Sequence, residues 1–196
     1  MISLREAVWS LKGSWLLLQN RPEGLSWFDL SLGGFWRSFG AILFILPLFW
    51  VSSLAEQKLI LMESDMTAEG LAATNFWVSR FLALGLDWIA LPLLLAALAG
   101  PIGISQGYAP FIAVRNWTSL LIAAPYALIG LFYLSGMISS GFTVLFWMTI
   151  LIAALWYRFV VARITLRCGV GLAIGIVVLD FLLSLFIQEM SGRLLG

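Results

Sequence analysis

Five long apolar runs constrain this chain more than any other feature of its sequence. An α-helix needs about 20 mostly apolar residues to cross the hydrocarbon core of a bilayer. Of the 196 residues, 62% are hydrophobic and only 11% are charged, which is more apolar surface than a water-soluble domain can cover. The sequence therefore predicts an all-α membrane protein, a bundle of five transmembrane helices over approximately residues 35–54, 76–98, 110–134, 141–157 and 170–187.

The segment that precedes the first run has a helical pattern of its own. Ser3 followed by Glu6 forms a capping box, which marks the start of a helix. We predict an amphipathic helix over residues 3–19 that lies on the cytoplasmic face of the bilayer. The alternative is that this helix packs against the cytoplasmic end of the bundle. The chain thus divides into a leader (1–34) and a transmembrane domain (35–196), and the apolar stripe of the leader consists of Leu4, Val8, Leu11, Trp15 and Leu18.

The distribution of basic residues predicts the orientation in the membrane, because cytoplasmic loops are enriched in Lys and Arg. Four basic residues precede or enter the first run, and three more follow the fourth: Arg158, Arg163 and Arg167. The segment after the first run is acidic, with one lysine against Glu56, Glu63, Asp65 and Glu69. We therefore expect a cytoplasmic N-terminus, a C-terminus on the opposite side, and a basic cytoplasmic face at Arg158, Arg163 and Arg167.

Two aspartates interrupt apolar runs. Asp87 lies midway along the second run and Asp180 near the middle of the fifth. A charged carboxylate at the bilayer centre costs about 2.5–3.5 kcal/mol, so each should face protein or water and find a partner. Hydrogen-bond donors are available on the third and fourth runs, among them Asn116 and Thr149. The two aspartates either approach each other and hold a proton or cation, or act as separate polar pins between helices.

Small and aromatic residues suggest how the helices pack. Gly171 and Gly175 form a G-x-x-x-G pattern, which permits close helix approach, either within the bundle or between copies in a homo-oligomer. Prolines inside the first three runs predict kinks that could open a cavity or be absorbed by packing: Pro47, Pro92 and Pro125. Six tryptophans near run ends are typical of interfacial anchors: Trp27, Trp36, Trp50, Trp77, Trp117 and Trp156. Trp88 and Trp147 lie deeper and need a hydrogen-bond acceptor.

Two short motifs resemble those of the Yip (Ypt-interacting protein) family of five-span membrane proteins. The first, before the first run, is carried by Asp29, Leu30, Gly33, Phe35 and Trp36, and the second, entering the third, by Gly107 and Tyr108. Here Gly34 stands where the family has proline. The sequence around these motifs is similar to that of the bacterial branch of the family. This resemblance implies a five-helix fold and a bacterial inner membrane and leaves the activity open.

The residue types in the sequence exclude several classes of function. Histidine is absent and Cys168 is the only cysteine, so the sequence offers no disulfide, no thiolate or imidazole metal site and no nucleophile with a histidine base. Net charge +1 gives no reason to expect nucleic-acid binding, and no motif indicates a cofactor or an enzyme. We expect a scaffold, a membrane organiser or an accessory subunit that docks anionic lipid or a membrane-protein partner. The alternative is a small proton- or ion-coupled transporter that uses Asp87 and Asp180, which would need a path for water to both.

Overall fold

The computed structural model describes residues 3–63, 68–73 and 75–195, and over these residues the chain is helical and contains no strand. Helix makes up 88% of the structure, which confirms the all-α prediction. Asp65, assigned from the sequence to the acidic loop, lies outside the described residues. The elements are α1 (Leu4–Leu18), η1 (Pro22–Trp27), α2 (Leu32–Ser38), η2 (Phe39–Ala41), α3 (Ile42–Glu63), α4 (Ala68–Ala73), α5 (Phe76–Leu98), α6 (Ser105–Leu134), α7 (Ser140–Leu166) and α8 (Val170–Leu195).

Five helical segments of the described chain are long and apolar enough to cross a membrane, and they coincide with the five runs. The first combines α2, η2 and α3, and the other four are α5, α6, α7 and α8. Several helices extend beyond their runs. In particular α6 begins at Ser105 and α7 continues to Leu166, so polar residues expected at helix ends lie well inside helices.

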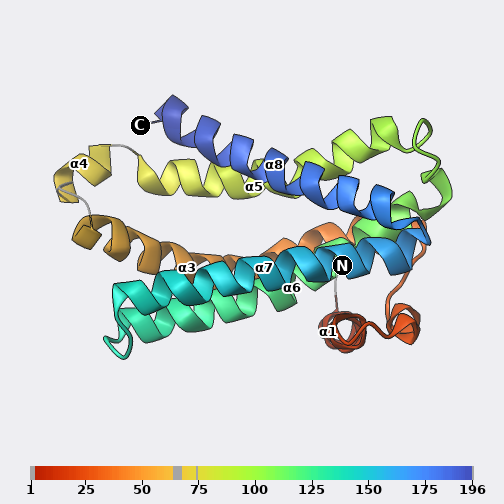
Figure 1. The fold of residues 1–196 in the computed structure, drawn as a ribbon, viewed down its shortest axis with the longest axis horizontal. Coiled ribbons are helices and arrows are strands. Elements are labelled where there is room, and N and C mark those ends of the chain that lie inside the picture. The colour runs from red at the N-terminus through yellow and green to blue at the C-terminus, as the bar shows by residue number, and fades with distance from the viewer. Residues whose placement is uncertain (1–2, 64–67, 74, 196) are drawn as a thin grey trace.

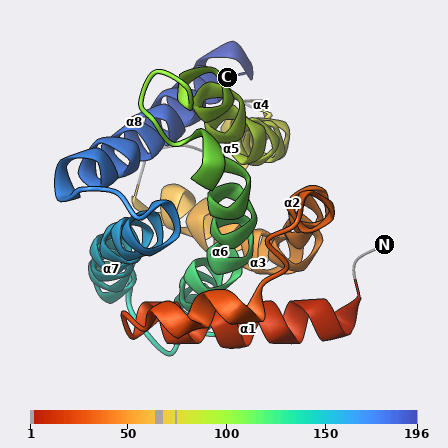
Figure 2. The ribbon, with the colours of Figure 1, turned by 90° about the vertical axis from the view of Figure 1, so that its right-hand side faces the viewer.

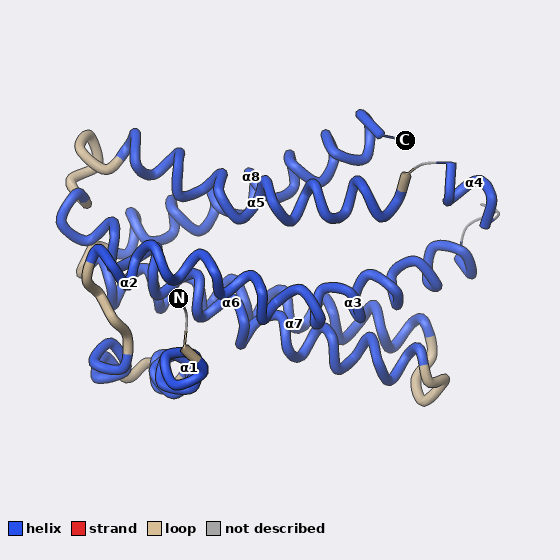
Figure 3. The backbone as a smooth tube through the Cα atoms, turned by 180° about the vertical axis from the view of Figure 1, so that it is seen from behind, coloured by secondary structure: helices blue, strands red, loops and turns tan. Residues whose placement is uncertain are grey.

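The long helices form two groups (Figure 1). In one group α3 packs on α6 and α6 on α7, while in the other α5 packs on α8. The groups touch mainly where α7 meets α8, and α8 leaves α7 progressively towards the C-terminus. Figure 3 shows the same arrangement from behind, with nearly all of the described chain in helices. We call residues 3–38 the collar. The end of the bundle with residues 99–104 and 167–169 is the collar end, and the end with α4 and residues 135–139 is the opposite end.

Helix α1 lies across the long helices rather than along them. It is seen end-on in Figure 1 and lengthwise beneath α6 and α7 in Figure 2. Its packed side consists of mostly small residues: Ala7, Ser10, Gly13, Ser14 and Leu17. These small side chains let α1 approach closely, and the Tyr157 hydroxyl donates a hydrogen bond to the Ser14 carbonyl oxygen at 2.6 Å. α1 is therefore fixed to the side of the bundle near its collar end.

The apolar stripe expected on the leader faces outward over much of its length. Leu4, Val8 and Trp15 are exposed, whereas Leu11 and Leu18 are partly buried and pack against the core. The two interpretations of the leader thus concern different sides of one helix, because the side that packs on the bundle is the small-residue side. The insertion of the outward stripe into a bilayer stays a prediction.

Candidate functional site

An ion network in the interior of the bundle joins α6, α7 and α8. One carboxylate, Asp180, accepts hydrogen bonds from Arg115 at 2.7 Å and from Arg158 at 2.8 Å. The side chains of Arg115 and Asp180 are only 3% and 8% exposed, and that of Arg158 is 24% exposed. One anion is therefore shared by two cations, and the three helices that carry them are tied together at that point.

Asp87, the second intramembrane aspartate, joins the same region from α5. Its carboxylate accepts a hydrogen bond from the Ser184 hydroxyl on α8, one helical turn beyond Asp180. It is also close enough to Arg115 and Arg158 to interact electrostatically with both. Two arginines and two aspartates thus balance in charge. Asp87 thus finds its partner on another helix, as expected, but the donor lies on the fifth span rather than among those available on the third and fourth.

The predicted basic face at Arg158, Arg163 and Arg167 needs correction. Because α7 continues to Leu166, Arg158 lies eight residues, or about 12 Å, inside its end and turns into the bundle to meet Asp180. Arg163 and Arg167 are exposed near the end of α7, where Arg167 takes a left-handed conformation with φ 49°. Only these two of the three arginines lie on an exposed basic surface.

Polar contacts of α6 and the deep tryptophans tie further helices together. The Asn116 amide, fully buried, donates to the Ser38 hydroxyl at 3.0 Å. Trp88 donates to the Phe39 carbonyl and Trp147 to the Tyr126 carbonyl, at 3.0 and 3.2 Å, so each of these indoles has the acceptor that its depth requires.

The six tryptophans expected at the span ends differ in exposure, and Trp27 and Trp77 are half-buried. Trp36, Trp50 and Trp156 are exposed, as interfacial anchors would be. Trp117 is 3% exposed and packs against Phe44, because α6 begins earlier than its apolar run and so places Trp117 in the core.

The first Yip-like motif forms a compact turn before α2. The Asp29 carboxylate accepts a hydrogen bond from the Ser31 N–H at 2.9 Å, and the Ser31 hydroxyl accepts one from the Gly34 N–H at 3.1 Å, which caps α2. The hydrogen bonds from Ser31, and then the nearby Arg37 guanidinium, hold the pKa of Asp29 below its ordinary value. The glycine that this turn requires is Gly34, because a Cβ there would lie 2.0 Å from the Asp29 carbonyl oxygen.

The two motifs, far apart in sequence, meet at the collar end. The rings of Phe35 and Tyr108 lie 5.9 Å apart, and the Tyr108 hydroxyl donates to the Pro92 carbonyl oxygen at 2.8 Å. A Cβ on Gly107 would lie 3.1 Å from Leu166, so this glycine permits a close approach of α6 to α7. Of the other motif residues, Leu30 packs against the core, whereas Gly33 and Trp36 are exposed.

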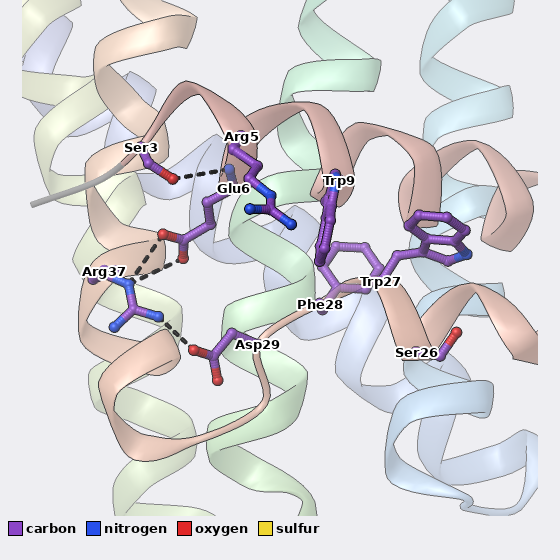
Figure 4. Close-up of a pocket in the computed structure, with 9 residues that line it drawn as sticks. All are labelled: Ser3, Arg5, Glu6, Trp9, Ser26, Trp27, Phe28, Asp29 and Arg37. Carbon is purple, nitrogen blue, oxygen red and sulfur yellow. Dashed lines mark hydrogen bonds and ion pairs between the residues drawn. The ribbon is translucent and has the colours of Figure 1, made fainter.

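A pocket of about 330 Å³ opens between α1, η1 and α2, in the collar. Figure 4 shows its lining, with Arg37 bound to Glu6 on one side and Asp29 on the other. Trp9 and Trp27 meet edge to face at 6.1 Å. Around them are the other lining residues: Ser3, Arg5, Ser26 and Phe28.

Two cations of the collar lie over these indoles. The guanidinium of Arg5 is 4.5 Å from the ring centre of Trp9, and the ammonium of Lys12 is 4.5 Å from that of Trp27. Neither forms a salt bridge with a described residue. The collar therefore combines aromatic surface with two cations that carry no matching carboxylate.

Two other features expected to guide packing have different outcomes. Gly171 and Gly175 face open space on α8, so this pair does not pack against another part of the described chain. The helices run on through Pro47, Pro92 and Pro125. Pro125 lines an apolar groove of about 240 Å³ between α1, α6 and α7. No group of three or more metal-ligating side chains occurs in the part of the chain that the structure describes.

Comparison with known proteins finds no family model, no curated protein and no solved structure that matches this chain. The likeness to the Yip family therefore rests on the residues of the two motifs.

Proposed function

We propose that this integral membrane protein is a non-enzymatic membrane organiser or scaffold whose collar binds the headgroups of anionic phospholipids. The observation that carries the proposal is the position of α1, which lies across the long helices (Figure 2). Its apolar stripe is turned outward, because Leu4, Val8 and Trp15 are exposed. Because the long helices run along the membrane normal, a helix across them runs in the plane of the bilayer.

An in-plane helix with an exposed apolar side is a membrane-surface element. Leu4, Val8 and Trp15 are 76%, 59% and 53% exposed, which water would disfavour and the boundary between headgroups and acyl chains would accept. The adjacent groove at Pro125 is apolar and suits an acyl chain. α1 would then occupy area in one leaflet only, while the spans hold it at a fixed depth.

The cations of the collar suit a phosphate. Arg37 is matched by two carboxylates, so it adds little attraction for an anion. Arg5 and Lys12 have no such partner among the residues that the structure describes, and they are held over tryptophan rings at the edge of the apolar stripe. Each basic residue near an anionic surface contributes about 1 kcal/mol of membrane attraction.

The proposal also includes the side of the membrane on which the collar lies and the membrane that contains the protein. Arg163 and Arg167 lie at the collar end with the leader, which supports a cytoplasmic location of this end by the positive-inside rule. The Yip-like motifs support a bacterial inner membrane. The exposed collar also offers a surface for a membrane-protein partner, as an accessory subunit would need.

Native mass spectrometry of the detergent-solubilised protein, titrated with phosphatidylglycerol or with phosphatidylcholine, tests the collar. The variant Arg5→Gln/Lys12→Gln should bind phosphatidylglycerol roughly 10–30-fold more weakly, from about 1 kcal/mol for each charge, and phosphatidylcholine unchanged. The matched control, Arg163→Gln/Arg167→Gln, removes the same charge at the same end and should have a smaller effect. Equal losses of affinity in the two variants would contradict a specific site, because the collar would then act only through general positive charge. Unchanged phosphatidylglycerol binding in the collar variant would also refute the proposal.

A further inference from the structure

A crevice separates α8 from α6 and α7 on the side towards the opposite end. Its volume is about 270 Å³. Figure 1 shows that α8 diverges from α7 towards this end. Its walls are largely aliphatic, but a line of polar side chains crosses it: Tyr126, Arg158, Asp180, Ser184 and Gln188. The crevice thus borders the interior ion network, because Arg158 and Asp180 are among its lining residues.

Two further hollows adjoin this crevice, because each shares lining residues with it. Towards the opposite end, a hollow of about 220 Å³ between α3, α4, α5 and α8 shares Gln188 with it and is also lined by Ser79 and Arg80. On the far side of the ion network, a cavity of about 10 Å³ shares Arg158 and Asp180 with it. That small cavity is lined by Arg115, so the three hollows form a series that ends at a buried arginine.

The polar lining requires a polar filling. A guanidinium or carboxylate exposed to hydrocarbon in the middle of a span costs about 2.5–3.5 kcal/mol, and the Arg158 side chain is 24% exposed. The crevice volume is many times the ~10–15 Å³ that one water needs. The Nε of Arg115 is buried without a partner in the described structure, and the cavity beside it has room for roughly one water.

We propose that the crevice is a water-filled half-channel, open at the opposite end, that delivers water and protons to the Arg158–Asp180 ion pair. Asp87 is reached through Ser184, which lines the crevice and donates to that carboxylate. On the collar side the half-channel is closed by side chains that are 2–4% exposed: Phe111, Val161 and Ile176. Both intramembrane aspartates are then in contact with one aqueous phase, as coupling to a proton or small ion requires.

Cysteine accessibility tests this route, because Cys168 is the only native cysteine and Cys168→Ser provides a cysteine-free background. Single variants in nanodiscs are treated with a permanently charged, water-soluble methanethiosulfonate, which reacts with thiolates in water. Leu155→Cys and Gln188→Cys lie on the crevice and leave the ion network intact. Ile152→Cys, on the lipid-facing side of α7 and 70% exposed, is the control for depth, and Val161→Cys tests the closed side.

Both crevice variants should react at least ~10-fold faster than Ile152→Cys, since only a hydrated thiol ionises. Val161→Cys should be as slow as the control. Crevice variants that react no faster than Ile152→Cys would overturn the proposal and indicate that lipid fills the crevice. Fast reaction at Val161→Cys would also overturn it, because the path would then cross the whole bundle. Unfolding in detergent at the end of each run, followed by complete labelling, shows that each cysteine was present and unmodified.

Discussion

The collar and the bundle interior each contain a three-membered ion network, and the two are mirror images in charge. In the collar one cation, Arg37, is shared by the carboxylates of Glu6 and Asp29. In the interior one anion, Asp180, is shared by the guanidiniums of Arg115 and Arg158. Both networks have two ion pairs, but Arg37 is 34% exposed and Asp180 only 8%.

The difference in exposure, rather than the number of bonds, should set what each network does. An exposed ion pair contributes about 0–1 kcal/mol, because water and salt screen it. Breaking a buried pair costs about 3–5 kcal/mol, because one charge is left in a medium that cannot solvate it. The interior network therefore fixes how α6, α7 and α8 fit together, whereas the collar depends more on close backbone packing.

The largest effect should come from Asp180→Asn. The substitution keeps the size of the side chain and removes the anion shared by two arginines, so we expect a loss of about 3–5 kcal/mol of stability. Thermal unfolding in nanodiscs, followed by tryptophan fluorescence, measures it. Glu189→Gln is the matched control on the same helix, since it breaks the exposed pair with Arg193 and should cost less than about 1 kcal/mol.

Equal melting temperatures of Asp180→Asn and the unmodified protein would remove the distinction between the two networks. The quadruple variant Arg115→Met/Arg158→Met/Asp180→Leu/Asp87→Leu adds a second check. It removes both arginines and both aspartates together and leaves no unmatched charge, so it should be more stable than Asp180→Asn alone.

A pair of glycine variants tests whether the collar depends on packing. Gly34→Ala places a Cβ against the Asp29 backbone, which cannot move without distorting the turn, and should cost about 1–3 kcal/mol. A Cβ at Gly33 would lie 3.2 Å from the far end of the flexible Arg37 side chain and 3.5 Å, an ordinary contact distance, from the Ser31 hydroxyl. Alanine also favours the helix over glycine by up to about 1 kcal/mol. We expect Gly33→Ala to be neutral or stabilising in the same unfolding assay. A similar cost for both variants would contradict the close approach at Gly34.

The spans were predictable from the sequence because length and apolarity alone define them. The partners of Asp180 were not, because they depend on where helices start and how they face one another. Arg115 follows Pro110 by five residues and so resembles a residue at a helix start, but α6 begins at Ser105 and carries it almost three turns inward. The guanidinium of an arginine at that depth in a span cannot easily reach the interface. The depth of Arg115 was therefore the feature that indicated a buried ion pair.

The leader shows the same limit on a smaller scale. Its apolar stripe was visible from helical spacing, but spacing does not reveal which side packs on the bundle. The packed side is formed by Ser10, Gly13 and Ser14, whose value lies in small size rather than apolarity. Hydrophobic periodicity therefore identifies the helix and its exposed stripe, while the docking surface emerges only from the fold.

The smallest expected effect is the response of the collar to acid. In the folded protein the pKa of Asp29 lies below its ordinary value of 3.8, mainly because of the hydrogen bonds from Ser31. A lowered folded pKa means that this contribution to stability is fully present above the ordinary pKa and is lost as pH falls through the folded value. Amide hydrogen-exchange protection at Ser31 and Gly34 should thus be constant from neutral pH down to about pH 4 and fall below it. In Asp29→Asn the same amides should show protection that does not change with pH, because the titrating group is gone. A pH-dependent loss that persists in Asp29→Asn would assign the acid response to another group and leave the collar network without a measurable role.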